Sequence, residues 1–411
     1  MAGDSDLKST PRSFTRDGPL SPDFLVVLLL YLISDAGRRG YDLLLESFWE
    51  HARESGVPLP QEDPVSGSAF CQARKRLRHE ALAQLLDRVV ELHDELNGEE
   101  YRFKGRRVLA VDGCKYTVRR SDENFEEFGN AKGGHNPQAT MSVLFDVIAQ
   151  MPVSATITKY GTCERTELLK LSEHMKPGDI CVLDRGYPSR EVFSRLTSLD
   201  VDVVIGMPFD QGGAVESFYE SGDKEAIVDL YDSPSARQSG RSSTRMRLVR
   251  REGDGTGPRV LATTLHKSDF SVGEICELYR FRWDLEMAYR MMKSDALGQG
   301  QLHSKSPEGV RQELYAHLLL MAITRKLMAA SATRHDVPFA EIPEKRALLQ
   351  MGKVILGLLM QSDMQAVDRD LDELLSFFVR RRRKPRPGRH SPRISYKPRL
   401  RWGANGRIGK A

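Results

Sequence analysis

Hydrophobic residues recur along the chain with two different periods, and the change between them divides it into regions. From about residue 21 to residue 97 apolar positions lie three or four residues apart, which predicts helices over 21–36, 41–55 and 80–96. Ser21-Pro22-Asp23 is typical of a helix start, and the apolar run that follows is ten residues long, too short to cross a bilayer. The first region is therefore predicted to be a helical domain without a membrane segment.

From residue 101 the pattern changes to short apolar runs that end at turn residues, as is typical of buried strands. Strands are predicted over 107–111, 139–147, 154–159, 179–183 and 201–206, with helices over 164–174 and 189–198. A hairpin followed by a strand–helix–strand unit predicts a mixed sheet flanked by helices, so the fold class is α/β. The segment 208–262 is rich in Gly, Ser and Asp and has strand-like pieces at 226–231, 244–250 and 259–264, which predicts a β-rich insertion.

Together these patterns predict seven regions. They are a disordered start at 1–20, a helical N-terminal DNA-binding domain at 21–98, a core in two parts at 101–207 and 266–335, the insertion at 208–265 between them, a helical C-terminal region at 336–379 and a basic tail at 380–411. Within the first domain, two short helices around a Gly-containing turn, the second carrying Arg74, Lys75 and Arg76, indicate a helix-turn-helix-like unit. A plain helical bundle fits the same pattern equally well.

Charge is distributed unevenly along the chain. The net charge is +4, but the tail from Arg380 to Ala411 contains thirteen Lys or Arg and no Asp or Glu, so the rest of the chain is net acidic. Such a tail predicts an arm for a polyanion, above all nucleic acid, with a solubilising tail as the alternative. The five cysteines are well separated and form no CxxC pair, which argues against a zinc site or a disulfide framework and favours a reducing cytoplasm.

One predicted helix carries a stripe of residues suited to chemistry. Tyr279, Arg282, Glu286 and Lys293 are separated by three, four and seven residues and share one face. Phe281, Leu285, Ala288 and Met292 form a separate apolar face that can pack against a core. Taken alone, the charged stripe is also consistent with an ordinary solvated helix face.

Two aspartates upstream favour the functional interpretation over the solvated helix face. Asp112 and Asp184 each follow a buried apolar strand at what is predicted to be a turn. Each alone is typical of a turn former, but with Glu286 they provide three carboxylates, which suit Mg²⁺ or Mn²⁺. Two such ions can support phosphodiester cleavage.

At these residues the chain resembles the IS4 family of bacterial insertion-sequence transposases, DDE enzymes with an RNase H-like core. Val111-Asp112-Gly113 resembles the first aspartate motif of the family, and Leu183-Asp184-Arg185-Gly186-Tyr187 resembles the second. The stripe fits the signature Tyr-x2-Arg-x3-Glu-x6-Lys, and 302–314 resembles the usual continuation. The resemblance covers roughly 20–330.

The resemblance implies roles for individual residues. Asp112, Asp184 and Glu286 would be the catalytic, metal-binding triad, and Tyr279, Arg282 and Lys293 would contact DNA phosphates. Arg185 and Tyr187 either position phosphate or metal or cap the next helix, and Arg290 is a further candidate for phosphate contact. Asp284 and Asp295 point away from Glu286 and are not expected to bind metal.

Several residues stand apart from this picture. Some relatives hold a flipped base on a tryptophan of the insertion, but this chain has no Trp in 208–262, so Phe209, Phe218 or Tyr219 would have to substitute. Cys114 is expected to be a small turn residue rather than a nucleophile, and His135 a polar loop residue rather than a DNA contact.

The expected protein is thus a Mg²⁺- or Mn²⁺-dependent transposase of the cytoplasm, associated with the nucleoid. It would act on double-stranded DNA, both its own inverted repeats and a target, as a homodimer and without a membrane. Two alternatives stay open: an RNase H-like endonuclease without strand transfer, and a DNA-binding protein derived from a transposase that no longer cuts.

Overall fold

The structure is a computed structural model of the 411-residue chain. It describes residues 14, 18–34, 40–132, 134–208, 213–230, 243–251, 260–292 and 302–383. The expectations for residues 1–13, for Lys293 and for the basic tail beyond residue 383 lie outside these ranges.

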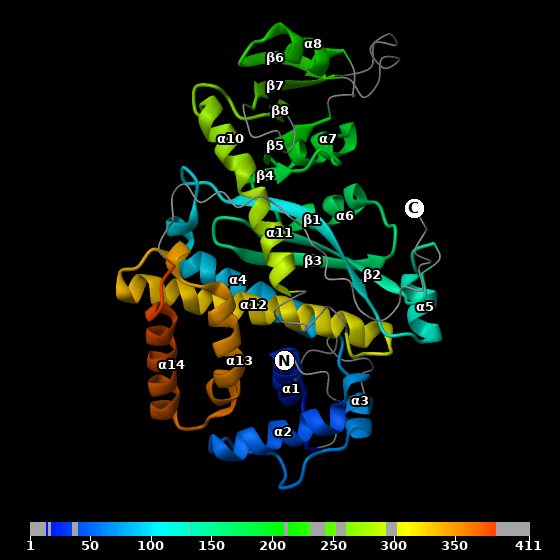
Figure 1. Cartoon of the computed structure of the whole chain (residues 1–411), viewed down its shortest axis with the longest axis vertical. Coiled ribbons are helices and arrows are strands. Elements are labelled where there is room, and N and C mark those ends of the chain that lie inside the picture. The colour runs from blue at the N-terminus through cyan, green and yellow to red at the C-terminus, as the bar shows by residue number, and fades with distance from the viewer. Residues whose placement is uncertain are drawn as a thin grey trace, which may run out of the picture.

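A single eight-stranded sheet forms the centre of the molecule, with strand order β3-β2-β1-β4-β5-β8-β7-β6 (Figure 1). Five of its strands belong to the predicted core: β1 (Val108–Thr117), β2 (Gln138–Asp146), β3 (Met151–Lys159), β4 (Ile180–Leu183) and β5 (Asp202–Met207). The β1–β2 and β2–β3 pairs are antiparallel, whereas β1–β4 and β4–β5 are parallel. This mixed sheet confirms the predicted α/β class and has the arrangement expected of an RNase H-like core.

The predicted insertion supplies the other three strands, β6 (Glu225–Leu230), β7 (Thr244–Arg250) and β8 (Val260–Thr263), with helix α8 (Ala214–Ser221) beside them. They do not form a sheet of their own, because β8 pairs antiparallel with β5 and continues the core sheet. The strand positions are readable from the sequence, but the pairing is not, since it joins segments more than fifty residues apart. Phe209 and parts of 231–259 lie outside the described residues.

Helices cover both faces of the sheet. Helices α6 (Glu164–Leu171) and α7 (Arg190–Ser198) pack on one face. The other face is covered by α4 (Glu80–Asn97), α10 (Val272–Arg280), α11 (Arg282–Met291) and the long α12 (Pro307–His335). Two apolar cores result, one on each face, because alternate residues of a strand point to opposite sides. Helix α5 (Asp122–Phe128) packs against β2, β3 and α12.

The N-terminal helices form a bundle with the C-terminal ones (Figure 1). Helix α1 (Pro22–Ser34) is almost wholly buried and contacts α12 and α13 (Glu344–Met360), which pairs with α14 (Met364–Val379). Among the described residues, no helix combines the length and the apolar character needed to span a membrane. Ser21 caps α1 as predicted, since its hydroxyl accepts a hydrogen bond from the Phe24 backbone N–H at 3.2 Å.

The helix-turn-helix alternative does not describe this bundle. Helices α2 (Tyr41–Glu54) and α3 (Gly67–Arg74) are separated by the segment 55–66, which is much longer than the three- or four-residue turn of such a unit. Arg74, predicted to belong to a basic DNA-binding helix, is 5% exposed and forms an ion pair with Glu313 of α12 at 3.2 Å. The alternative prediction, a plain helical bundle, describes the N-terminal helices.

Burial of His317 makes the stability of the fold depend on pH. The side chain lies inside α12, 3% exposed, and burial together with His303 lowers its pKa to about 3. In the unfolded chain a histidine takes up a proton near pH 6.5, so the unfolded state binds more protons and stability falls as pH drops below that value. Between pH 7.5 and pH 5.5, wild type should lose on the order of 1 kcal/mol more unfolding free energy than His317→Gln.

Denaturant titrations at the two pH values measure this difference. His135→Gln, at a histidine exposed in the folded chain, is the control and should follow wild type. Equal pH dependence in wild type and His317→Gln would contradict the prediction.

Candidate active site

Asp112 lies within a strand rather than at its end. Strand β1 continues to Thr117 because β2 pairs with it through the whole stretch, so the predicted turn at Asp112-Gly113 is wrong. The parallel pairing with β4, however, stops at Ala110. Asp112 therefore sits just beyond the end of the parallel ladder, half-buried, with one carboxylate oxygen accepting a hydrogen bond from the Gly113 N–H at 2.8 Å.

Asp184 follows directly after β4, as predicted. Its Oδ1 accepts a hydrogen bond from the Arg185 N–H at 2.6 Å. Ala110 of β1 is in register with Val182 of β4, so Asp112 and Asp184 each stand two residues beyond the last paired position. The parallel ladder thus brings both aspartates to the same edge of the sheet.

Glu286 is carried by a helix that crosses β1 (Figure 1). The predicted continuous helix is divided in two, because Phe281 forms a turn between α10 and α11. Tyr279 consequently belongs to one helix and Glu286 to the next. The predicted apolar face is confirmed, since Leu285, Ala288 and Met292 are buried in the core and Phe281 packs partly buried against it.

Tyr289, one turn after Glu286, fixes α11 to the sheet. Its hydroxyl donates a hydrogen bond to the backbone oxygen of Asp112 at 2.6 Å and accepts one from the Val143 N–H at 3.1 Å. Asp112 and Val143 are directly opposite each other in β1 and β2, so the phenol bridges the two strands at Asp112. Sequence reasoning missed this residue, because a buried tyrosine in a helix gives no distinguishing signal.

The charged groups of the site act on one another. Burial raises the pKa of Asp112 to about 6; the hydrogen bond from Gly113 and the charge of Arg282 oppose this shift, while Glu164 and Glu286 add to it. Arg282 pairs with Glu286 at 2.8 Å. Burial works to lower the pKa of Arg282, but Tyr279, Asp184 and Glu286 outweigh it and the pKa is raised.

The charges of Asp112, Asp184 and Glu286 act on the same neighbouring groups, but their oxygens are not close enough together to surround one metal ion. Among the described residues, one group of three potential ligands has donor atoms all within 4.8 Å of one another, and it is His79, Glu80 and Glu308. In that group His79 already hydrogen-bonds Glu308 through its backbone N–H and its ring. The predicted triad is therefore brought together by the fold without being drawn to coordination distance.

The predicted DNA contacts fall into two groups. Arg185 and Arg290 are exposed, so their side chains can reach a ligand, whereas Arg282 is 9% exposed and faces the carboxylates. Tyr187 and Tyr279 are 1% and 4% exposed, so direct contact with DNA is at odds with this structure for both. The core buries both rings. Lys293 lies outside the described residues.

Glu164 is a further carboxylate beside Asp112 that sequence reasoning did not single out. It is the first residue of α6, and a Cβ built on Gly113 would lie 3.0 Å from its Oε1, so glycine leaves room for it. Its only signal in the sequence is its position at a helix start.

The structure also locates most of the other candidates. Cys114 is buried on β1 rather than in a turn, and His135 is exposed. Phe218 is 5% exposed, and the ring of Tyr219 lies 4.7 Å from the Arg250 guanidinium. Burial raises the pKa of Asp284 to about 6, and the charge of Arg325 on α12 opposes that shift only in part. Asp295 lies outside the described residues.

Comparison with known proteins points to one family. Residues 103–323, more than half of the chain, match the transposase DDE domain. The chain is 27% identical over 289 residues to the transposase InsG for insertion sequence element IS4 of Escherichia coli (strain K12), covering 67% of this chain and 64% of that protein. It is 22% identical over 256 residues to the transposase for insertion sequence element IS421 of Escherichia coli, covering 52% of this chain and 64% of that protein.

The chain thus spans a little less than two thirds of the length of these relatives. Among solved structures, a piggyBac transposase synaptic complex with hairpin DNA is similar with a TM-score of 0.47 at 11% identity, over 89% of this chain and 76% of that chain.

Replacing Tyr289 with phenylalanine tests its role as the bridge. The variant leaves the Asp112 carbonyl and the Val143 N–H without the phenol in a buried place, which should lower the unfolding free energy by about 1–3 kcal/mol. Tyr101→Phe is the matched control, because Tyr101 is similarly buried and its hydroxyl has no hydrogen-bond partner among the described residues. Denaturant unfolding of both variants measures the difference, and equal losses would argue against the bridge.

Proposed function

Because the chain belongs to the DDE transposase family, we propose that it cuts DNA at the inverted-repeat ends of its insertion sequence and joins the freed 3′-hydroxyls to target DNA. The observation that carries the proposal is the register of β1 and β4, which places Asp112 and Asp184 at one sheet edge. Tyr289 then fixes the helix of Glu286 against the same strand. Water would attack the phosphodiester at the element end, and the bond to the departing strand would break and leave a 3′-hydroxyl.

The donor set fits a divalent cation such as Mg²⁺ or Mn²⁺. All three groups are carboxylates, the hard oxygen ligands that these ions prefer. One oxygen of Asp112 and one of Asp184 accept a backbone hydrogen bond, which orients each carboxylate. Asp112, Asp184 and Glu286 would hold the metal, which would lower the pKa of an attacking water and stabilise the leaving oxygen.

The cationic side chains of the site would bind DNA phosphates and neutralise their charge. Arg282 lies beside Glu286, and the charge of Asp184 acts on it and helps to raise its pKa, so it can neutralise charge that develops on a phosphate bound there. Arg185 follows Asp184 directly and is exposed, and Arg290 is exposed one turn beyond Glu286. Both can bind flanking phosphates of the DNA backbone.

The partner we propose is double-stranded DNA, as the transposon ends and as the target. Joining two ends in one event requires two active sites, so we propose a homodimer assembled on DNA. The N-terminal bundle and the basic tail would contribute further DNA affinity.

Replacing Asp184 with alanine tests the catalytic assignment. Wild type should cut DNA that carries the element's own flanks at the repeat boundaries when Mg²⁺ is present, and Asp184→Ala should lose at least a thousandfold in rate because one of three metal ligands is gone. Binding of end DNA should stay within about twofold, since Asp184 donates nothing to a phosphate. Gel-based cleavage and a binding titration measure the two quantities.

Asp229→Ala is the control, because Asp229 is an exposed aspartate on the edge strand β6. Equal cleavage by Asp184→Ala and wild type would refute the triad. Specific binding of the ends without any cleavage by wild type would identify a DNA-binding protein that no longer cuts, and cutting without joining would identify an endonuclease.

Metal affinity should depend on pH through Asp112. Because burial raises the pKa of this carboxyl to about 6, a proton competes with the metal as pH falls through that value. The apparent affinity for Mn²⁺ should fall roughly fourfold between pH 7.5 and pH 5.5. Calorimetric titration of Mn²⁺ into the protein measures this without cleavage, and Asp112→Asn should bind weakly at both pH values. An affinity independent of pH in wild type would contradict the prediction.

A further inference from the structure

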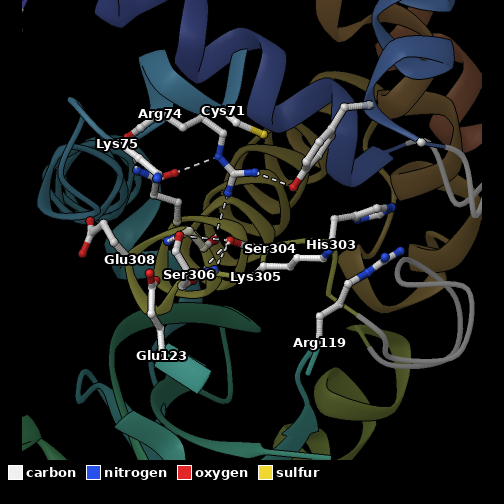
Figure 2. Close-up of a pocket in the computed structure, with 14 residues that line it drawn as sticks. Cys71, Arg74, Lys75, Arg119, Glu123, His303, Ser304, Lys305, Ser306 and Glu308 are labelled. Carbon is white, nitrogen blue, oxygen red and sulfur yellow. Dashed lines mark hydrogen bonds between the residues drawn. The ribbon is translucent and has the colours of Figure 1, made fainter. Parts of the chain in front are cut away.

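A cavity of about 440 Å³ opens between the N-terminal helices and the core, and none of the three carboxylates lines it (Figure 2). Its wall is made by α2, α3, the segment after β1 and the start of α12. Four segments far apart in the sequence therefore meet here.

The floor of the cavity is rigid and electrically balanced. Arg74 donates hydrogen bonds to Gln312 Oε1 at 2.9 Å and to the Tyr41 hydroxyl at 2.9 Å, and it pairs with Glu313 at 3.2 Å. Its guanidinium also donates to the Gly309 carbonyl at 2.9 Å. Because Glu313 and three further acceptors already partner Arg74, its guanidinium has little charge left to offer a ligand.

The rim, in contrast, carries an excess of positive charge. Lys75, Arg119 and Lys305 are exposed, and no ion pair to any of them is found among the described residues. Figure 2 shows these three side chains around the same opening. Two acidic residues, Glu123 and Glu308, also line the cavity, and His79 hydrogen-bonds Glu308, so three exposed cations face two carboxylates.

The N-terminus of α12 adds to the positive electrostatic potential at the rim. The helix is 29 residues long, begins at the cavity with Ser306 as its N-cap, and has a positive dipole end there. Three cations from separate segments repel one another, and an anion placed between them removes that cost. An anion that can reach the open rim therefore fits this cavity.

We propose that this cavity is a subsite for backbone phosphates of DNA, bound by Lys75, Arg119 and Lys305. The inference rests on the proposed function, because that function supplies DNA as the polyanion. Arg119 follows Asp112 by seven residues of extended chain, so the two lie no more than roughly 25 Å apart. At 3.4 Å per base pair, the subsite holds phosphates within about seven base pairs of the cut.

Salt dependence of binding tests the subsite. Removing one cation that binds a phosphate should reduce the slope of log affinity against log salt by about 1, so the triple variant Lys75→Gln, Arg119→Gln, Lys305→Gln should lower the slope by about 3. Random-sequence duplex DNA is the probe, so the result does not depend on recognition of the ends. The control is Lys353→Gln with Arg369→Gln, two exposed cations on α13 and α14.

Phosphate-ethylation interference locates the subsite on the DNA. With Asp184→Ala protein on end DNA, ethylation of one or more phosphates within about seven base pairs of the boundary should weaken binding, and this sensitivity should disappear in the triple variant. Thermal melting confirms that the variants fold.

The outcomes separate the subsite from the catalytic proposal. A slope as steep in the triple variant as in the control overturns the subsite, even where wild type cuts DNA. A reduced slope in a protein that never cuts supports the subsite and refutes only the catalytic proposal. Tighter binding of a mononucleotide than of duplex DNA, abolished in the triple variant, would assign the cavity to a small ligand and overturn the proposal.

Discussion

The hydroxyl of Tyr289 is the contact on which the geometry of the active site depends. Apolar packing of α11 against the core fixes which face of the helix is buried, but such packing is non-directional and leaves the helix free to slide along the sheet. A buried hydrogen bond to the backbone of Asp112, completed by the Val143 N–H, removes that freedom. Because Glu286 is one turn away on the same helix, its position relative to Asp112 follows from this bridge. The register of β1 and β4 then places Asp184 beside Asp112 at the same edge of the sheet.

The carboxylates of the site repel one another, and Arg282, a residue of the same site, offsets part of this repulsion. Carboxylates gathered at a half-buried sheet edge repel one another, and burial raises the pKa of Asp112 to about 6. Arg282 offsets part of this repulsion through its ion pair with Glu286 and its proximity to Asp184. A bound divalent cation would neutralise the carboxylates in place of Arg282. The guanidinium would then be free to bind the phosphate of the substrate. The group that compensates the carboxylates is thus one that the proposed reaction would also use.

Sequence reasoning recovered what depends on local pattern and failed where long-range packing decides. Apolar runs located the core strands, and the strand end before Asp184 was correct. Asp112-Gly113 reads as a turn by local preference, yet pairing with β2 overrides that preference. Arg74 reads as a basic surface residue because its partner Glu313 lies more than two hundred residues later. The resemblance assigns Tyr279 a phosphate contact, and Tyr187 was a candidate either for positioning phosphate or metal or for capping the next helix; the core buries both rings, which their motifs do not indicate.

The spread of the site along the chain has a consequence for the order in which it is made. A ribosome delivers β1 to β5 first, and with them both aspartates at one sheet edge, whereas α11 follows only after three more strands have been added. Since domains fold largely as the chain emerges, a nascent or truncated product that ends before α11 holds the N-terminal cations but lacks Glu286. It also lacks Lys305 and α12, so neither the proposed active site nor the proposed phosphate subsite is complete in it. Both proposed sites would therefore be completed only when the later helices have been made.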